Sequence, residues 1–466
     1  MKMFSLALRN LLRTRRRSLT TLSAMVVGLV SMLIFGGYAR NAILATQVGY
    51  VQYHGHLQIQ RKGYFLYGSG NPVAYSISDY QRIIRAVKDD PVLRPMLVVV
   101  TPSLRLNGIA GNFSSGVSKG VVAAGVVVND QNKMREWDEY GGMVHAPLIA
   151  LAGTPSDSAV IGTGVARQLQ MCAALKLDDC PSAEEMRSAD HAADAPAAPP
   201  GIEALSELEQ ASAPTTSGAH IELLAASARG APNVADLRVV QAENWGVKEI
   251  DDSLIVMHLE QAQRLAFGSA APQITAIQIQ LAHTAQIPAA KARLEQLLAT
   301  QFKTAPLEVL DYETLTPIYQ QVIQFLDSIF GFMSILIFVI VLFTVGNTMS
   351  TAVVERTTEI GTLRAIGQRR SGIRHLFVCE GVLLGVIGSV LGIAMALPIA
   401  YLINHSGMSW APPGYSHKYP VAVRVWGDMG LIVGSAVSLV AVTIASAWWP
   451  ANRAARLNIV EALRHV

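Results

Sequence analysis

The stretch that decides the fold is residues 355–370, ERTTEIGTLRAIGQRR, a charged segment that lies between two long apolar runs. Its four arginines outnumber its two glutamates. Basic loops next to membrane helices are retained on the cytoplasmic side, so this excess predicts a cytoplasmic location. A short charged loop between two membrane helices suits docking by a cytoplasmic partner.

The composition indicates a membrane protein. Hydrophobic residues make up 51% and charged residues 15% of the chain, and the mean hydropathy is +0.33, too apolar for an ordinary soluble protein of this length. Four runs are long enough to span a bilayer, which takes about 20 residues of helix. The predicted membrane helices are residues 19–40, residues 316–349 with an external stalk at their start, residues 376–403 and residues 429–449. The predicted fold is four transmembrane helices with a large α/β domain inserted between the first two.

Basic residues near the predicted spans give the orientation. They gather in residues 1–18, 350–375 and 450–466, which all fall on one side of a four-span arrangement and are therefore predicted to be cytoplasmic. Residues 1–18 suit an amphipathic helix on the inner leaflet, and the run after Arg15-Arg16-Arg17 is long enough for an uncleaved membrane helix. The net charge of +3 is explained by these segments and gives no case for nucleic-acid binding.

Residues 41–315 and the short loop 404–428 are then external. Alternating or β-branched stretches predict strands at 51–60, 96–106, 119–128 and 274–281, and helical patterns occupy 78–90 and 287–302. We expect a porter-like subdomain from residues 41–110 and 246–315, with residues 111–245 inserted into it. Within the insertion, residues 181–220 are rich in Ala, Pro, Ser and Glu and predict a flexible loop. This loop is either a tolerated surface insertion or a partner-binding tether.

The search for enzymatic chemistry finds no phosphate-binding loop, no H-E-x-x-H and no G-x-S-x-G motif. We therefore expect no catalysis by this chain. His54 and His56 share one face of a predicted strand and are interpreted as ordinary residues of a solvated surface. No His or Cys cluster predicts a metal site. Cys172 and Cys180 could close a small disulfide loop in an oxidising compartment, with two free thiols as the alternative.

Glycines recur along one face of the third predicted span, and no ionisable residue lies in the middle of any span. Small residues on one helix face allow another helix to approach closely. The stripe predicts either a moving or dimeric helix interface or plain packing within the chain. Its members, with the two glycines of the fourth span, are Gly381, Gly385, Gly388, Gly392, Gly430 and Gly434.

Three features together resemble one family. They are the four-span layout, the segment ERxxEIGxLRAIG at 355–367, and the ending PAxRAAxxxxVEALR at 450–464. This combination is similar to the MacB/FtsX-type (type VII) ABC transporter permeases, over essentially the whole chain. Residues 160–166 and 246–263 also resemble the lipoprotein-releasing LolC/LolE branch. Residues 181–220 depart from the compact family pattern, so substrate contacts cannot be transferred residue by residue there.

The resemblance implies a coupling helix after the second span that docks on a separate ABC ATPase dimer. An apolar stripe of Ile360, Leu363 and Ile366 would make the contact, and Glu355, Glu359 and Arg364 would offer ion pairs. The coupling residues implied by the family motif are Glu355, Arg356, Glu359, Ile360, Gly361, Leu363, Arg364, Ala365, Ile366 and Gly367.

The resemblance also implies the function. A permease subunit in the bacterial inner membrane would couple ATP hydrolysis in its partner to periplasmic movement, without passing its substrate through the bilayer. The substrate would be a lipoprotein, a lipid or a small toxic molecule. The chain would bind no cofactor, because ATP and Mg belong to the ATPase, and it would pair with an identical or related permease among membrane lipids. A periplasmic adaptor or outer-membrane protein is a further candidate partner. The alternative is an FtsX-like signalling subunit that activates a periplasmic hydrolase.

Overall fold

The computed structural model describes residues 7, 9, 13, 15–141, 146–177, 219–411, 414 and 418–459. The chain forms two compact units. The helical unit comprises Met1–Leu44, Gln320–Trp410 and Pro420–Val466, and the α/β unit comprises Ala45–Tyr319 and Ala411–Tyr419. The segment predicted to be flexible, residues 181–220, falls almost entirely outside the described residues.

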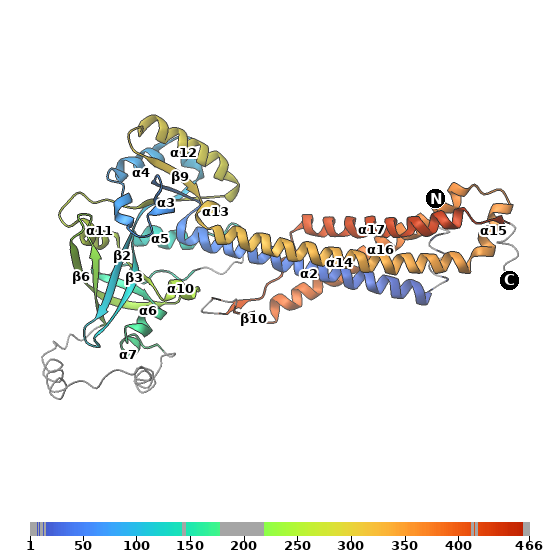
Figure 1. Cartoon of the computed structure of the whole chain (residues 1–466), viewed down its shortest axis with the longest axis horizontal. Coiled ribbons are helices and arrows are strands. Elements are labelled where there is room, and N and C mark those ends of the chain that lie inside the picture. The colour runs from blue at the N-terminus through green and yellow to red at the C-terminus, as the bar shows by residue number, and fades with distance from the viewer. Residues whose placement is uncertain are drawn as a thin grey trace. The chain divides into compact units, whose positions relative to one another are not determined.

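Four long helices account for the predicted membrane spans: α2 (Arg15–His54), α14 (Pro317–Glu355), α16 (Arg370–His405) and α17 (Met429–Ala455) (Figure 1). Each is long and apolar enough to cross a membrane. Helix α2 does not end near residue 40 as predicted, and part of the strand predicted at 51–60 is its last turn. The helix stops at Gly55, whose φ of 76° is open to glycine but costly for other residues.

The glycine stripe of α16 packs within the chain. A Cβ on Gly381 would lie 2.7 Å from Ala447 Cβ, and one on Gly385 would lie 2.4 Å from Thr443 Oγ1, both on α17. Gly388 and Gly392 face Met25 and Leu29 of α2 in the same way. By contrast, a Cβ on Gly434 would meet nothing within 4 Å. The four α16 glycines thus let α2 and α17 approach α16 closely.

The α/β unit is organised by one nine-stranded sheet with the order β3-β7-β4-β6-β5-β2-β8-β1-β9 and an additional β3–β2 pairing. That extra pairing closes β2, β3, β7, β4, β6 and β5 into a ring, while β8, β1 and β9 extend from β2 as an open sheet. The strands are β1 (Leu57–Arg61), β2 (Leu97–Asn112), β3 (Val117–Val126), β4 (Ser158–Gly162), β5 (His220–Ala226), β6 (Pro232–Glu243), β7 (Leu254–His258), β8 (Ala276–Leu281) and β9 (Leu307–Asp311).

Strand β2 joins the ring to the open sheet because it is 16 residues long. Its first half pairs with β8, and Ser103 to Asn112 pair with β3. The division expected at residue 246 moves toward the C-terminus, since β7 pairs with β3 and β4 inside the ring and the following helix α11 (Leu259–Phe267) packs on β3. Residues Val122 to Val126 of β3 pair in parallel with β7, which lies more than 120 positions later in the chain. A pairing between such distant segments cannot be predicted from the order of the elements along the chain.

Helices cover the sheet and share one core with it. Helix α4 (Tyr80–Asp89) buries Tyr80, Ile83 and Val87, and α12 (Ile287–Gln301) buries Leu294 and Leu297. Figure 1 shows α4 and α12 beside β9, while α11 lies by the ring. Within the described residues, the remaining short helices are α3 (Tyr64–Tyr67), η1 (Pro72–Tyr75), η2 (Arg94–Met96), α5 (Val128–Arg135), α6 (Thr163–Gln168), α7 (Cys172–Leu175), α10 (Lys248–Asp251), η3 (Thr284–Gln286) and α13 (Tyr312–Leu315), and two short strands are β10 (Ser409–Trp410) and β11 (Tyr419–Pro420).

The polar face of β1 and β8 is buried, contrary to the solvated surface expected there. His56 and Gln280 are fully buried, and Gln58, Gln60 and Gln278 are each at least nine-tenths buried. Alternation of polar and apolar residues normally marks a strand with one face in water. Here the polar face is covered by other polar groups, because Gln280 Nε2 donates to the carbonyl oxygens of Met134 and Val51.

Candidate partner-docking helix

The charged segment 355–370 forms a short helix, α15 (Thr357–Ala365), directly after α14. Arg356 stands at its N-cap, and the chain turns out of it at Gly367, whose φ is 102°. Such a backbone conformation favours glycine because a Cβ would be strained there. The nine-residue helix is therefore bounded on both sides by sharp changes in chain direction.

The predicted docking stripe is divided by the packing of α15. Ile360 is only 3% exposed and belongs to the core of the helical unit, with Leu363 packed partly against that core. Ile366 is 80% exposed. The expectation that all three side chains face a partner is therefore corrected, because Ile360 holds α15 to its own unit and Ile366 projects from it.

Arg356 points into the helical unit and pairs with Glu380 of α16. The Arg356 Nη1 and Glu380 Oε1 atoms lie 3.0 Å apart, and the two side chains are 12% and 3% exposed. Breaking such a buried pair leaves an uncompensated charge, which typically costs about 3 to 5 kcal/mol. Arg356 is thus a positioning residue for α15 within the chain, and it does not face outward as the motif implied.

The acidic groups predicted to meet an ATPase have partners within the chain. Arg13 Nη1 lies 2.7 Å from Glu359 Oε1 with both side chains well exposed, and Arg17 pairs with Glu355. Exposed pairs of this kind contribute about 1 kcal/mol or less, so another protein can replace either partner at little cost. Arg364 Nη1 donates to the carbonyl oxygen of Leu457 at 2.5 Å.

What α15 leaves on the surface is a compact patch, which we call the α15 face. It combines one large apolar side chain with small polar groups and two arginines. Its exposed residues are Thr358, Glu359, Thr362, Ala365, Ile366, Gly367, Arg369 and Arg370. A patch with a protruding aliphatic anchor and a charged rim has the composition of a protein-docking site.

Among the described residues, no group of three or more His, Cys, Asp or Glu side chains could hold a metal ion. Cys172 begins α7 and is disulfide-bonded, whereas Cys180 lies outside the described residues, so its role as the partner stays a prediction. Cys379 is a free, half-buried thiol in α16.

Residues 331–459 match the FtsX-like permease C-terminal family, a stretch that contains α15, α16 and α17. Residues 331–459 are thus similar to an FtsX-like permease domain, and the described part of the chain has four helices long and apolar enough to span a membrane.

Curated relatives are ABC transporter permeases. The chain is 30% identical over 175 residues to the macrolide export ATP-binding/permease protein MacB of Bordetella avium, covering 38% of this chain and 25% of the relative. It is 34% identical over 127 residues to the ABC transporter permease YtrF of Bacillus subtilis, covering 25% of this chain and 28% of the relative. An ABC transporter permease of Methanocaldococcus jannaschii is 25% identical over 215 residues, covering 46% of this chain and 51% of the relative. The chain thus spans about half or less of the length of these relatives.

Among solved structures, the extracellular domain of the noncanonic ABC-type transporter YknZ from Gram-positive bacteria aligns with 55% of this chain and 100% of its own. The sequence identity is 12% and the TM-score 0.29, a likeness too weak to carry an argument. The similarity to MacB and YtrF confirms the predicted resemblance to MacB/FtsX-type permeases over the matched residues, whereas the LolC/LolE branch stays a prediction.

Proposed function

We propose that this chain is the transmembrane subunit of an ATP-driven ABC transporter of the bacterial inner membrane. It converts ATP hydrolysis in a separate cytoplasmic ATPase dimer into movement of its α/β unit on the periplasmic side. The substrate is acted on from the periplasm and is a lipoprotein, a lipid or a small toxic molecule. Both termini and α15 lie in the cytoplasm in this proposal, as the basic residues around α15 favour.

The observation that carries the proposal is the way α15 is held. Its inner side is fixed by Ile360 in the core and by the Arg356–Glu380 pair, while Ile366, directly after the helix, is exposed. A helix anchored in this way moves together with α14 and α16 when something pushes on its face. Ile366 is 80% exposed and contributes little to the fold, so it is the side chain of the α15 face that we assign to contact with the ATPase.

Two further observations support motion transfer and pairing. Helices α2 and α14 are continuous over 40 and 39 residues, and an unbroken helix transmits an axial displacement that a flexible linker would absorb. In α14, the most apolar 18-residue window is only 17% buried inside the chain. This leaves a broad apolar surface for lipid and for a second permease chain, either identical or related.

The experiment compares Ile366→Asp with Leu66→Asp, a matched control on α3 that is 69% exposed. The full chain is purified in lipid nanodiscs with the ABC ATPase that co-purifies from its own host. Ile366→Asp should abolish association and the permease-dependent part of ATP hydrolysis, and Leu66→Asp should leave both unchanged. Undiminished binding of the ATPase to folded Ile366→Asp would refute docking at the α15 face.

The runner-up function is an FtsX-like signalling subunit that activates a periplasmic hydrolase. Docking of the ATPase on α15 would be the same in both cases. The two functions differ in whether a substrate leaves the membrane. ATP-dependent transfer of labelled lipid or lipoprotein out of reconstituted vesicles supports the transporter. No such transfer, together with ATP-dependent activation of a periplasmic hydrolase, supports the alternative.

A further inference from the structure

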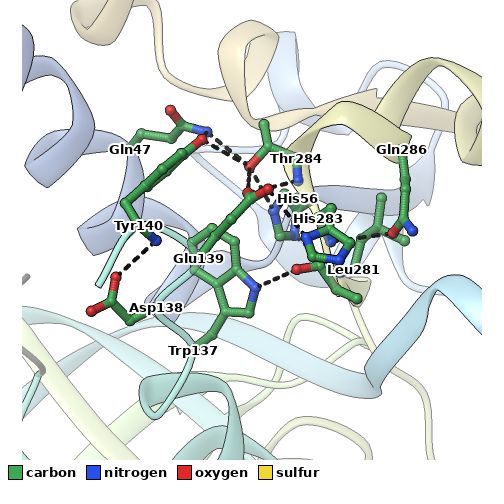
Figure 2. A network of polar contacts seen from close by, with 11 residues as sticks. Gln47, His56, Trp137, Asp138, Glu139, Tyr140, Leu281, His283, Thr284 and Gln286 are labelled. Carbon is green, nitrogen blue, oxygen red and sulfur yellow. Dashed lines mark hydrogen bonds and ion pairs between the residues drawn. The ribbon is translucent and has the colours of Figure 1, made fainter. Parts of the chain in front are cut away.

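The C-terminal end of α2 is fastened to the α/β unit by polar side chains. Figure 2 shows the part of this network centred on Thr284, with Gln47 approaching from α2, Glu139 and Tyr140 from the segment after α5, and His56 from the start of the sheet. All of these residues belong to the α/β unit. We call this group, together with His283, the Thr284 cluster.

The bonds of Thr284 have a defined direction. Its backbone N–H and its hydroxyl both donate to Glu139 Oε2, at 2.9 and 2.7 Å. Because the hydroxyl proton is used in that bond, Thr284 Oγ1 must accept from Gln47 Nε2, which lies 3.0 Å away. Gln47 Nε2 also donates to the Tyr140 hydroxyl at 3.1 Å. A single threonine therefore links α2 to two other segments of the unit.

His56 completes the cluster on the sheet side. The backbone N–H of Leu281 donates to His56 Nδ1 at 3.0 Å, so Nδ1 carries no proton and Nε2 carries the ring N–H. His56 Nε2 lies 3.4 Å from Thr284 Oγ1, and the Trp137 ring stands edge-on at a centroid distance of 4.8 Å. The ring is locked in one tautomer between β8 and η3.

Glutamine side chains cap the last turn of α2. The final carbonyl groups of a helix have no partner within it, and here buried glutamine amides donate to three carbonyls of this turn, of which Val51 O also accepts from the Gly55 N–H at 2.9 Å. Gln280 Nε2 lies 3.4 Å from Val51 O, Gln131 Nε2 donates to Tyr53 O at 3.0 Å, and Gln58 Nε2 donates to His54 O at 3.1 Å. Gln52, itself 1% exposed, donates to Trp137 O at 2.9 Å. The caps come from β8, α5 and β1.

This fastening is expensive and geometrically specific. Burying polar side chains costs free energy unless their hydrogen bonds are made, and apolar residues would hold a helix end without that constraint. Hydrogen bonds have preferred distances and angles, so fixed donors and acceptors on three elements restrict both the rotation and the axial position of α2. The end of α2 is thus joined to the sheet at a fixed register.

We propose that the Thr284 cluster and its glutamine caps form a joint that passes displacement of α2 to β8 and to the segment after α5, with Thr284 as its positioning residue. The inference rests on the proposed function for the source of the displacement. It goes beyond that function by naming where the movement enters the α/β unit.

The first test needs no ATPase. Hydrogen exchange is measured on the full chain in lipid nanodiscs for Thr284→Val, for the conservative Thr284→Ser and for Thr300→Val, whose hydroxyl bonds only within α12. Amides of residues 48–54 should exchange about tenfold faster in Thr284→Val alone, with β4 and β7 unchanged. Unchanged exchange at 48–54, or equally faster exchange throughout the unit, would overturn the joint.

The second test uses the complex with the co-purified ATPase, with and without a slowly hydrolysed ATP analogue. In the wild type and Thr284→Ser, nucleotide should change exchange in α15 and in residues 282–286. In Thr284→Val the change in α15 should persist and the change at 282–286 should disappear. A persistent response at 282–286 in Thr284→Val would refute the joint, whereas no response of α15 even in the wild type would refute the proposed function and leave the first test to decide the fastening.

Discussion

Replacing Arg135 with methionine should destabilise the α/β unit by about 3 to 5 kcal/mol, the usual cost of removing one partner from a buried ion pair. Arg135 ends α5 and is 1% exposed, and its Nη1 lies 2.8 Å from Glu243 Oε1 on β6. Its guanidinium carbon also lies 4.9 Å from the centroid of the Tyr53 ring and 5.2 Å from that of Trp245. The side chain therefore ties α5, β6 and the end of α2 together.

The magnitude comes mainly from the carboxylate that would be left behind. Burial raises the pKa of Glu243, Arg135 lowers it, and Asp251 raises it further. Without Arg135, the folded-state pKa lies still higher above the unfolded value. A carboxyl group with a raised folded pKa is stable when protonated, so its contribution is present below the unfolded pKa and is lost as pH rises through the folded pKa. The deficit of Arg135→Met should accordingly be larger at pH 8 than at pH 5.

The assay is urea unfolding of the full chain in one detergent, followed by tryptophan fluorescence at both pH values. The double variant Arg135→Met/Glu243→Met replaces the pair with apolar side chains of similar volume and should be less destabilised than either single variant. Strictly additive losses, together with a deficit that does not change between pH 5 and pH 8, would refute the account of Arg135 as the counter-charge of Glu243.

Two further substitutions test other parts of the packing. Burial lowers the pKa of His56 from 6.5 to about 4. The free energy of unfolding should therefore be highest above pH 6.5 and should fall by on the order of 3 kcal/mol as the pH drops through 4. This pH dependence should be absent from the urea midpoints of His56→Gln. Gly385→Leu should lower the free energy of unfolding by about 1 to 3 kcal/mol, because its Cβ would lie 2.4 Å from Thr443 Oγ1. The control Gly434→Leu has open space around its Cβ and should melt at the wild-type temperature. Equal melting temperatures of the two variants would count against close packing of α16 on α17.

The helical unit was predictable because its signals are local. A run of about 20 apolar residues is sufficient to indicate a membrane helix, and the strand that ends at Leu281 and the helix that begins at Ile287 were likewise placed by periodicity. The end of α2 was not, since Val51 to His54 fit a strand pattern as well as a helix. Tertiary contacts decide in favour of the helix, because the amides of Gln131 and Gln280 donate to carbonyl groups of the last turn of α2.

The buried polar face is the clearest failure of local reading. His56, Gln58 and Gln280 alternate with apolar residues as they would on a solvated strand, yet all three are buried. Polar residues are placed inside a protein only where partners exist, and those partners lie far away in sequence: Gln280 bonds Met134 across 146 positions and His56 bonds Leu281 across 225. The same holds for α15, where the pairing of Arg356 with Glu380 turned a motif residue inward.

In the proposed function, movement begins at α15 and reaches the α/β unit through the Thr284 cluster, and the two places use different kinds of polar contact. At α15, the charges near the surface form exposed pairs such as Arg13 with Glu359, which are weak and exchangeable. At the Thr284 cluster, Gln47 and His56 are buried, Thr284 and Glu139 are half-buried, and the hydrogen bonds are directional. An input that must engage and release a partner needs the first kind of contact, whereas a joint that must pass movement on without slipping needs the second. If the contacts at the Thr284 cluster were weak and those at α15 did not release the ATPase, ATP hydrolysis would have no effect on the α/β unit.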